Sequence, residues 1–96
     1  PPSGVPSAGS GPVPALDVES KISMYQDVLR QDPKNVNALV GLGNLLMDSG
    51  RYPEAIDAYA KALEIEPSDV NVRTDMGTCY RRIGRPQKAV EAYRKS

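Results

Sequence analysis

The chain has 96 residues, which is enough for one small domain, and its 12 Lys and Arg side chains balance its 12 Asp and Glu side chains. A net charge of zero gives no indication of a protein that binds nucleic acid or an anionic membrane. The sequence has no His and one Cys, so it lacks the commonest general base, a disulfide pair and a thiolate zinc cluster, and we expect neither an enzyme nor a bound metal or cofactor.

The first fourteen residues, PPSGVPSAGSGPVP, are Pro, Gly or Ser at eleven positions and carry no charged side chain. Such a segment cannot bury enough apolar surface to offset the entropy lost on ordering, so residues 1–14 are predicted to be a flexible linker. A Pro-rich ligand is the alternative, but a PxxP repeat with flanking basic residues is missing. Because the chain begins with Pro, we expect a soluble fragment, with any membrane anchor of the parent protein placed before this linker. The compartment stays open.

Apolar residues at helical spacing begin after the linker. Ile22 and Tyr25 belong to a first predicted helix within residues 15–33, where Asp17 can cap the start and Pro33 disfavours continuation. The same periodicity, with Gly and Pro as stop signals, predicts four more helices at residues 35–49, 53–66, 69–83 and 86–96.

The sequence repeats itself after 34 residues. Residues 36–62 and 70–96 are identical at nine of 27 aligned positions. The same spacing separates Tyr25, Tyr59 and Tyr93, so the first helix corresponds to the second half of a preceding repeat. A period of 34 with helix–turn–helix content is typical of repeat proteins, whose units stack because none can bury its apolar face alone.

This pattern resembles the tetratricopeptide repeat family. The positions of the first full repeat that carry the resemblance are Leu39, Leu42, Gly43, Leu46, Ala55, Tyr59, Ala62 and Pro67. The second repeat departs from the family pattern at Arg73 and Ser96. The resemblance implies an all-α fold, namely a right-handed α-solenoid of antiparallel helix pairs, here with five helices. It divides the chain into a capping half repeat (15–33), a first repeat (35–68) and a second repeat truncated at its C-terminal end (69–96).

The resemblance also implies a concave groove lined by the first helix of each repeat. The function that the resemblance implies is that of a scaffold or adaptor, which binds a peptide segment of another protein in this groove. The corresponding groove positions here are Asn37, Val40, Asn44, Met47, Asn71, Thr74, Thr78 and Arg81. Amides supply donors and acceptors together, which suits hydrogen bonds to a peptide backbone. The alternative is that these side chains are ordinary solvated helix surface.

One subclass of the family clamps the C-terminal carboxylate of chaperone tails with Lys and Asn side chains. Asn44 matches one position of that clamp, but Val40 stands where the clamp needs Lys, and Asp75 stands where it needs a second Asn. Because the carboxylate of Asp75 would repel the carboxylate of such a ligand, we expect a different one.

A basic cluster around a predicted turn consists of Arg81, Arg82, Arg85 and Lys88. Its residues fit a solvated turn, a contact with an acidic peptide, or a phosphate or nucleic-acid site. No aromatic residues alternate with the basic ones as a stacking platform requires, so no nucleic-acid partner is expected.

Two further features are explained by packing. Cys79 corresponds to Leu45 in the repeat register and has no His to activate it, so it is predicted to be a core residue. The stretch GLGNLL at residues 41–46 lacks the third Gly, the preceding strand and the Lys-Ser/Thr ending of a phosphate-binding loop. Its glycines are therefore predicted to lie inside a helix and not in a phosphate-binding loop.

The last predicted helix offers an uncovered apolar face. Terminal repeats normally present a polar outer face, whereas Ala89, Val90 and Tyr93 have no following helix to cover them. A homodimer, a domain swap or a further helix of the full protein would cover this face. Residues 1–68 carry five basic and nine acidic side chains, a net charge of −4, and residues 69–96 carry seven basic and three acidic, a net charge of +4. This asymmetry either is a chance distribution over solvated faces or favours end-to-end self-association. The alternative functions are therefore structural self-assembly, or an accessory module tethered within a larger, membrane-anchored protein.

Overall fold

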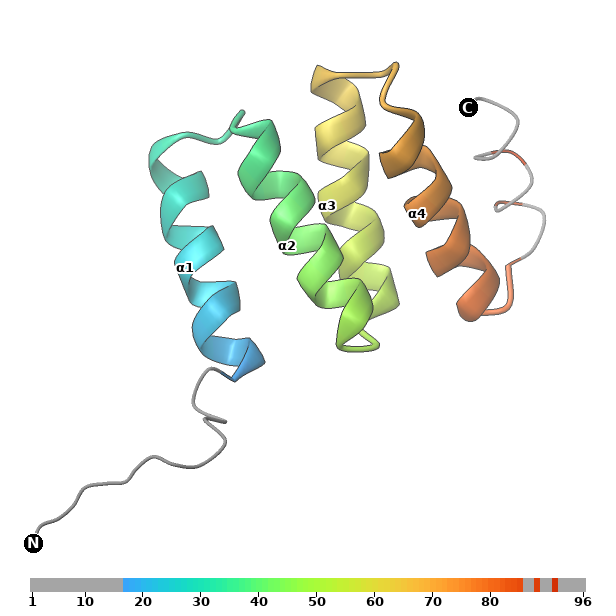
Figure 1. The fold of residues 1–96 in the computed structure, drawn as a ribbon, viewed down its shortest axis with the longest axis horizontal. Coiled ribbons are helices and arrows are strands. Elements are labelled where there is room, and N and C mark those ends of the chain that lie inside the picture. The colour runs from blue at the N-terminus through green and yellow to red at the C-terminus, as the bar shows by residue number, and fades with distance from the viewer. Residues whose placement is uncertain (1–16, 86–87, 89–90, 92–96) are drawn as a thin grey trace, which may run out of the picture.

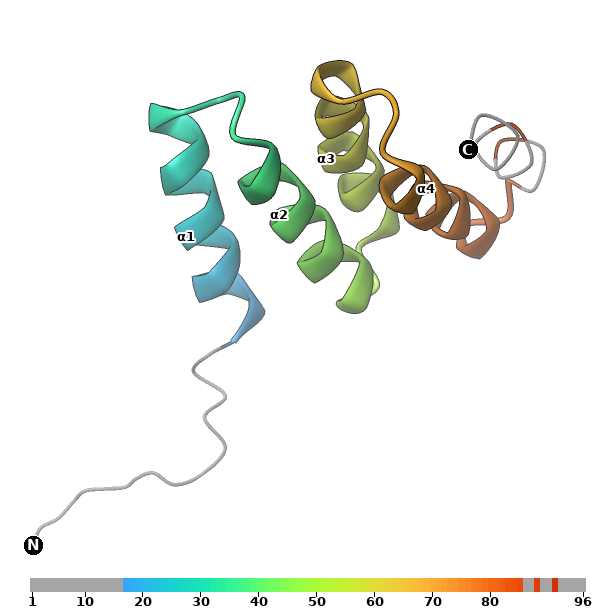
Figure 2. The same ribbon diagram turned by 45° about the horizontal axis from the view of Figure 1, so that its top comes forward.

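The computed structural model describes residues 17–85 together with Lys88 and Glu91. This part of the chain contains four helices and no strand; the helices are α1 (Val18–Gln31), α2 (Val36–Asp48), α3 (Tyr52–Ile65) and α4 (Val70–Arg82). They lie in chain order in a single row, each antiparallel to the one before it and packed against it (Figure 1). The turned view in Figure 2 shows the same row of helices. The all-α class predicted from the sequence is confirmed.

The number of helices differs from the prediction, because five are predicted and the described residues hold four. The fifth, predicted over residues 86–96, lies outside the described part of the chain except for Lys88 and Glu91, which are helical. Their side chains form an ion pair with 3.8 Å between Nζ and Oε1. The predicted linker, residues 1–14, also lies outside the described part. Within that part, no helix is both long enough and apolar enough to cross a membrane.

Side-chain caps begin α1, α2 and α4. The side-chain oxygens of Asp17, Asn35 and Asp69 accept hydrogen bonds from the backbone N–H three residues further on, over 2.9, 2.9 and 3.1 Å. Each cap satisfies a donor that has no partner inside the helix and is worth about 1 kcal/mol. Helix α3 has no side-chain cap and instead carries Pro53 in its first turn, where the missing N–H costs nothing.

Glycine and proline end the helices as the sequence predicts. The chain turns after α2 and α4 at Gly50 and Gly84, whose φ angles of 78° and 80° lie in the left-handed region that favours glycine. Helices α1 and α3 end directly before the residues that precede Pro33 and Pro67. Alternating stop signals of this kind fold the chain back on itself at each helix end.

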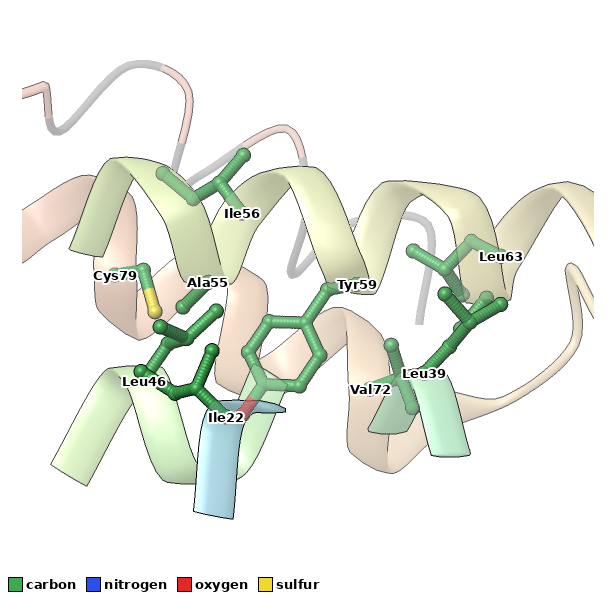
Figure 3. Packing of buried hydrophobic residues seen from close by; sticks show 10 residues of the cluster. Ile22, Leu39, Leu46, Ala55, Ile56, Tyr59, Leu63, Val72 and Cys79 are labelled. Carbon is green, nitrogen blue, oxygen red and sulfur yellow. The ribbon is translucent and has the colours of Figure 1, made fainter. Parts of the chain in front are cut away.

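Tyr59 of α3 is the centre of the hydrophobic core. Its side chain is fully buried, and Figure 3 shows its ring among residues of the other helices. The ring lies so close to Gly43 of α2 that a Cβ there would come within 2.6 Å of Tyr59 Cε1. Helices α2 and α3 therefore approach each other closely at Gly43. The core cluster consists of Ile22, Leu39, Leu46, Ala55, Ile56, Tyr59, Ala62, Leu63, Val72 and Cys79.

Arg73 occupies the position at which the first repeat has the buried Leu39. Its guanidinium folds back toward the turn between α3 and α4, where Nε donates a hydrogen bond to the carbonyl oxygen of Pro67 over 2.9 Å. Arg73 is thus half-buried while its charged end reaches the carbonyl oxygen of Pro67. This contact explains how the second repeat keeps its fold without the apolar residue of the family pattern.

Candidate protein-binding groove

The eight predicted groove residues lie on two helices that run in the same direction, because α3 returns the chain between them (Figure 1). Helix α2 carries Asn37, Val40, Asn44 and Met47, and helix α4 carries Asn71, Thr74, Thr78 and Arg81. Asn37, Asn71, Thr74 and Arg81 are exposed, and the other four are half-buried. These exposures are suited to side chains that line a surface groove.

A hydrogen bond from the core fixes one groove residue. The Tyr59 hydroxyl donates to Oδ1 of Asn44 over 2.6 Å and lies 3.9 Å from Sδ of Met47. Because the amide oxygen of Asn44 is occupied in this way, its NH₂ group is left as a pair of donors for another acceptor. The fully buried Tyr59 thereby orients a polar side chain at the surface of α2.

An open cleft of about 450 Å³ lies along the first half of α2. It is lined by Asn35, Val36, Asn37, Val40, Gly41, Asn44, Glu66 and Asp69. Three of the predicted groove residues meet here, and they are joined by two carboxylates from the turn between α3 and α4. No Lys or Arg contributes to this lining, so the cleft presents amides and negative charge.

Sequence reasoning missed Glu66 and Asp69 as groove residues. Asp69 is the N-cap of α4 and accepts a hydrogen bond from the backbone N–H of Val72. Because this capping role already explains an Asp at this position, the sequence gives no separate reason to expect it in the groove. The 34-residue period contains a signal that could have found it, because Asp69 corresponds to Asn35, which lines the same cleft.

A second cleft, of about 270 Å³, lies at the other end of the two helices and is lined by Met47, Asp48, Tyr52, Thr78 and Arg82. It brings the predicted residues Met47 and Thr78 together from different helices. Thr78 Oγ1 donates a hydrogen bond to the carbonyl oxygen of Thr74 over 3.1 Å. Asn71, Thr74 and Arg81 line neither cleft.

Asp75, a half-buried residue of α4, lines neither cleft but carries a carboxyl group whose pKa is shifted by its surroundings. Burial raises the pKa of its carboxyl group, and the charges of Asp48 and Asp69 raise it further. The pKa of Tyr59 is raised in turn, first by burial and then by the charge of Asp75. In the described ranges, no Lys or Arg forms an ion pair with Asp75. The charge of Asp75 therefore has no salt-bridge partner among these residues, whereas Arg82 lies beside Asp48 in the smaller cleft.

The remaining predicted features are placed as follows. Cys79 is fully buried, and burial raises the pKa of its thiol to about 11, with Asp75 adding to the shift. The basic residues Arg81, Arg82, Arg85 and Lys88 are all exposed. Ala89, Val90 and Tyr93, predicted for self-association, lie outside the described residues. Among the residues that the structure describes, no group of three or more His, Cys, Asp or Glu side chains could hold a metal ion.

Comparison with known proteins identifies the repeat. Residues 34–96 match the model of the Tetratricopeptide repeat family. No curated protein sequence shows significant similarity to the chain. Among solved structures, MamA AMB-1 has a TM-score of 0.78 and 28% identity over 86% of this chain and 49% of that chain. MamA MSR-1 has a TM-score of 0.78 and 26% identity over 86% and 48%. A further MamA crystal structure, at 24% identity, has a TM-score of 0.79 over 86% and 49% and shows the same fold.

The chain spans about half the length of these MamA structures. The family match covers most of the described helices, with the 34-residue period, the Gly43–Tyr59 contact and the alternating helix directions all inside it. On these grounds the chain belongs to the tetratricopeptide repeat family.

Proposed function

We propose that the chain is a scaffold or adaptor module that binds a segment of another protein between α2 and α4, on the concave face of a right-handed solenoid. The tetratricopeptide repeat match and the likeness to MamA support a protein-interaction module of non-enzymatic type. The hydrogen bond from Tyr59 to Asn44 carries the proposal further, because it holds an amide NH₂ group at the edge of a polar cleft.

The chemistry of the cleft suits an extended peptide. A peptide backbone carries one donor and one acceptor per residue, so a site that binds it needs both. Asn44 supplies donors, and the exposed amide of Asn37 supplies a donor and an acceptor. Val40 lies between them in the lining and adds apolar contact. Ligand segments with different side chains fit such a cleft, because the groove residues bind the peptide backbone that all of these segments share.

The charge of the groove restricts the ligand. The larger cleft is lined by the carboxylates of Glu66 and Asp69 and by no Lys or Arg, and within the described residues neither carboxylate forms an ion pair. A free C-terminal carboxylate would meet repulsion here, which agrees with the missing clamp residues at Val40 and Asp75. The ligand is therefore an internal segment of the partner rather than its C-terminus.

Affinity capture from a lysate of the source organism, followed by mass spectrometry, tests the function. The groove variant Asn37→Ala/Asn44→Ala removes two lining amides, and Asp57→Ala/Glu64→Ala changes two exposed side chains of α3 as a matched control. Circular dichroism first establishes that all three proteins are equally helical. We expect a partner that wild type and control retain and the groove variant loses. Equal capture by all three would place binding elsewhere.

A further inference from the structure

The first helix presents an apolar face at the end of the row. Lys21, Met24, Tyr25 and Val28 line a mainly apolar cleft of about 420 Å³ on α1. Met24 is 66% exposed and Val28 is 43% exposed, although both are large hydrophobic residues. They are four residues apart and so lie one above the other on a single helix face. The opposite side of α1 buries Ile22 against the core.

The repeat register shows what kind of face this is. Lys21, Met24 and Val28 correspond to Ala55, Ala58 and Ala62 of α3, which are at most 5% exposed and face the neighbouring helices. The face of α1 is thus the counterpart of a helix-packing face. Its side chains are larger than Ala, however, so another helix cannot approach α1 as closely as α2 approaches α3. The face suits a looser contact than the one between helices of the same repeat.

We propose that this face of α1 pairs with the same face of a second copy of the chain, antiparallel and about a two-fold axis. The argument is charge complementarity. Lys21 lies at one end of the face. Asp32, the C-cap residue directly after α1, follows at the other end, where the helical repeat places its Cα within about 20° of that of Lys21 around the axis and about 16 Å along it. Both side chains are exposed, and within the described residues neither forms an ion pair.

An antiparallel pair places Lys21 of each copy beside Asp32 of the other and sets Tyr25 over Val28. A parallel pair in register would instead place Lys21 beside Lys21 and Asp32 beside Asp32, which is repulsive. The two-fold arrangement therefore satisfies both charges and covers the apolar cleft with one contact that each copy makes identically.

The contact involves only one helix from each copy. The surface that it buries is therefore smaller than the roughly 1,200–2,000 Å² of a standard stable interface. We therefore expect weak association, with a dimer that forms in the range of about 0.1–1 mM and dissociates on dilution. Added salt weakens the Lys21–Asp32 contacts and shifts the equilibrium toward the monomer.

Sedimentation equilibrium of the full chain from about 10 µM to about 1 mM tests the proposal with a charge-swap series. Lys21→Asp and Asp32→Lys each create two like-charge contacts, and each should weaken the dimer about tenfold or more. The double variant Lys21→Asp/Asp32→Lys restores opposite charges and should recover the wild-type affinity. Val28→Glu buries a charge at the centre of the contact and should leave a monomer, and circular dichroism checks that every variant is helical.

A wild type that stays monomeric at all concentrations would overturn the proposal. So would a double variant as weak as the single ones, because rescue is specific to the antiparallel pair. A dimer that survives Val28→Glu but is lost on Tyr93→Ser would assign self-association to the other end of the chain. A partner protein that binds this face in preference to a second copy would also count against it.

Discussion

The hydroxyl of Tyr59 donates a 2.6 Å hydrogen bond to Oδ1 of Asn44, and this single contact connects the fully buried core of the repeat to its exposed groove. The ring of Tyr59 packs on Gly43, and its hydroxyl reaches the groove residue one position further along α2. Stability and the proposed binding therefore depend on the same side chain. A change to the hydroxyl alone should separate the two effects, since the ring would keep its packing.

Tyr59→Phe removes the hydroxyl and leaves the amide oxygen of Asn44 without its donor. We expect the free energy of unfolding to fall by about 1 kcal/mol, because the lost hydrogen bond is partly buried. Partner capture should weaken as well, since the amide of Asn44 becomes free to rotate. Urea denaturation measures the first effect, and the capture assay measures the second. Tyr52→Phe, at a half-buried Tyr that lines the smaller cleft, is the control and should change stability by less than about 0.5 kcal/mol.

Gly43→Ala and Gly41→Ala should differ, although both glycines lie in α2 against a Tyr ring. A Cβ at Gly43 would come within 2.6 Å of a ring atom of Tyr59, which is fully buried and cannot move aside. Overpacking of this kind costs about 1–3 kcal/mol, more than the roughly 1 kcal/mol that Ala gains over Gly in a helix. We expect Gly43→Ala to lower the free energy of unfolding and to weaken the contact of Tyr59 with Asn44.

At Gly41 the corresponding distance is 2.7 Å, but the ring that it approaches belongs to Tyr25, which is half-buried beside the open cleft on α1. That ring can shift toward the open side, so the gain in helix propensity offsets most of the clash. The net change should stay within about 1 kcal/mol of zero. Thermal unfolding of both variants checks the comparison. An equal loss of stability in the two variants would contradict the argument that the ring of Tyr25 can shift toward the open side.

The elements that the sequence predicts well are those set by local chemistry. Asp17 and Asn35 cap helices because their short side chains reach a backbone N–H three residues on, whatever surrounds them. Gly50 and Pro33 act through their own backbone conformations. Gly43 and Tyr59 are both positions of the repeat pattern, so the sequence marks each residue, but their mutual contact is not local and is seen only in the folded arrangement.

Contacts specific to this chain escaped prediction. The approach of Gly41 to Tyr25 joins α1 to α2, and no pattern within one repeat distinguishes Gly41 from any other helix position. Glu66 enters the groove from a turn whose residues have no helical periodicity. The influence of Asp48 on Asp75 depends on the spacing of α2 and α4, which only the folded arrangement fixes. The eight groove positions therefore stay a prediction, while the clefts show which of them meet.

Asp75→Asn should stabilise the protein at neutral pH. Burial, with the charges of Asp48 and Asp69, raises the pKa of Asp75 in the folded state above its unfolded value. The folded state then binds the proton more tightly, so this group lowers stability as pH rises from its unfolded pKa through its folded pKa. The substitution removes that penalty above the window and changes little below it, where the carboxyl group is neutral in both states.

Thermal unfolding at pH 7 and at pH 3 measures this effect. Asp57→Asn, at an exposed position of α3, is the matched control and should leave the midpoint nearly unchanged at both pH values. The same Asp75→Asn protein should tolerate an acidic peptide in the groove better than wild type does. A lower melting temperature at pH 7 would mean that the carboxylate of Asp75 makes a favourable contact in the folded state.

Cys79 should react slowly with a thiol reagent while the protein is folded. Its side chain is fully buried, and burial raises the pKa of the thiol to about 11, so that only a small fraction is thiolate at pH 8. Labelling by a disulfide reagent should be at least about 100-fold slower than in the urea-unfolded chain, because it requires opening of the structure. Asp75→Asn should not accelerate labelling through local exposure, although it lowers the thiol pKa by removing a nearby charge. Rapid labelling of the native protein would place Cys79 at the surface and would reopen the possibility that it acts as a nucleophile.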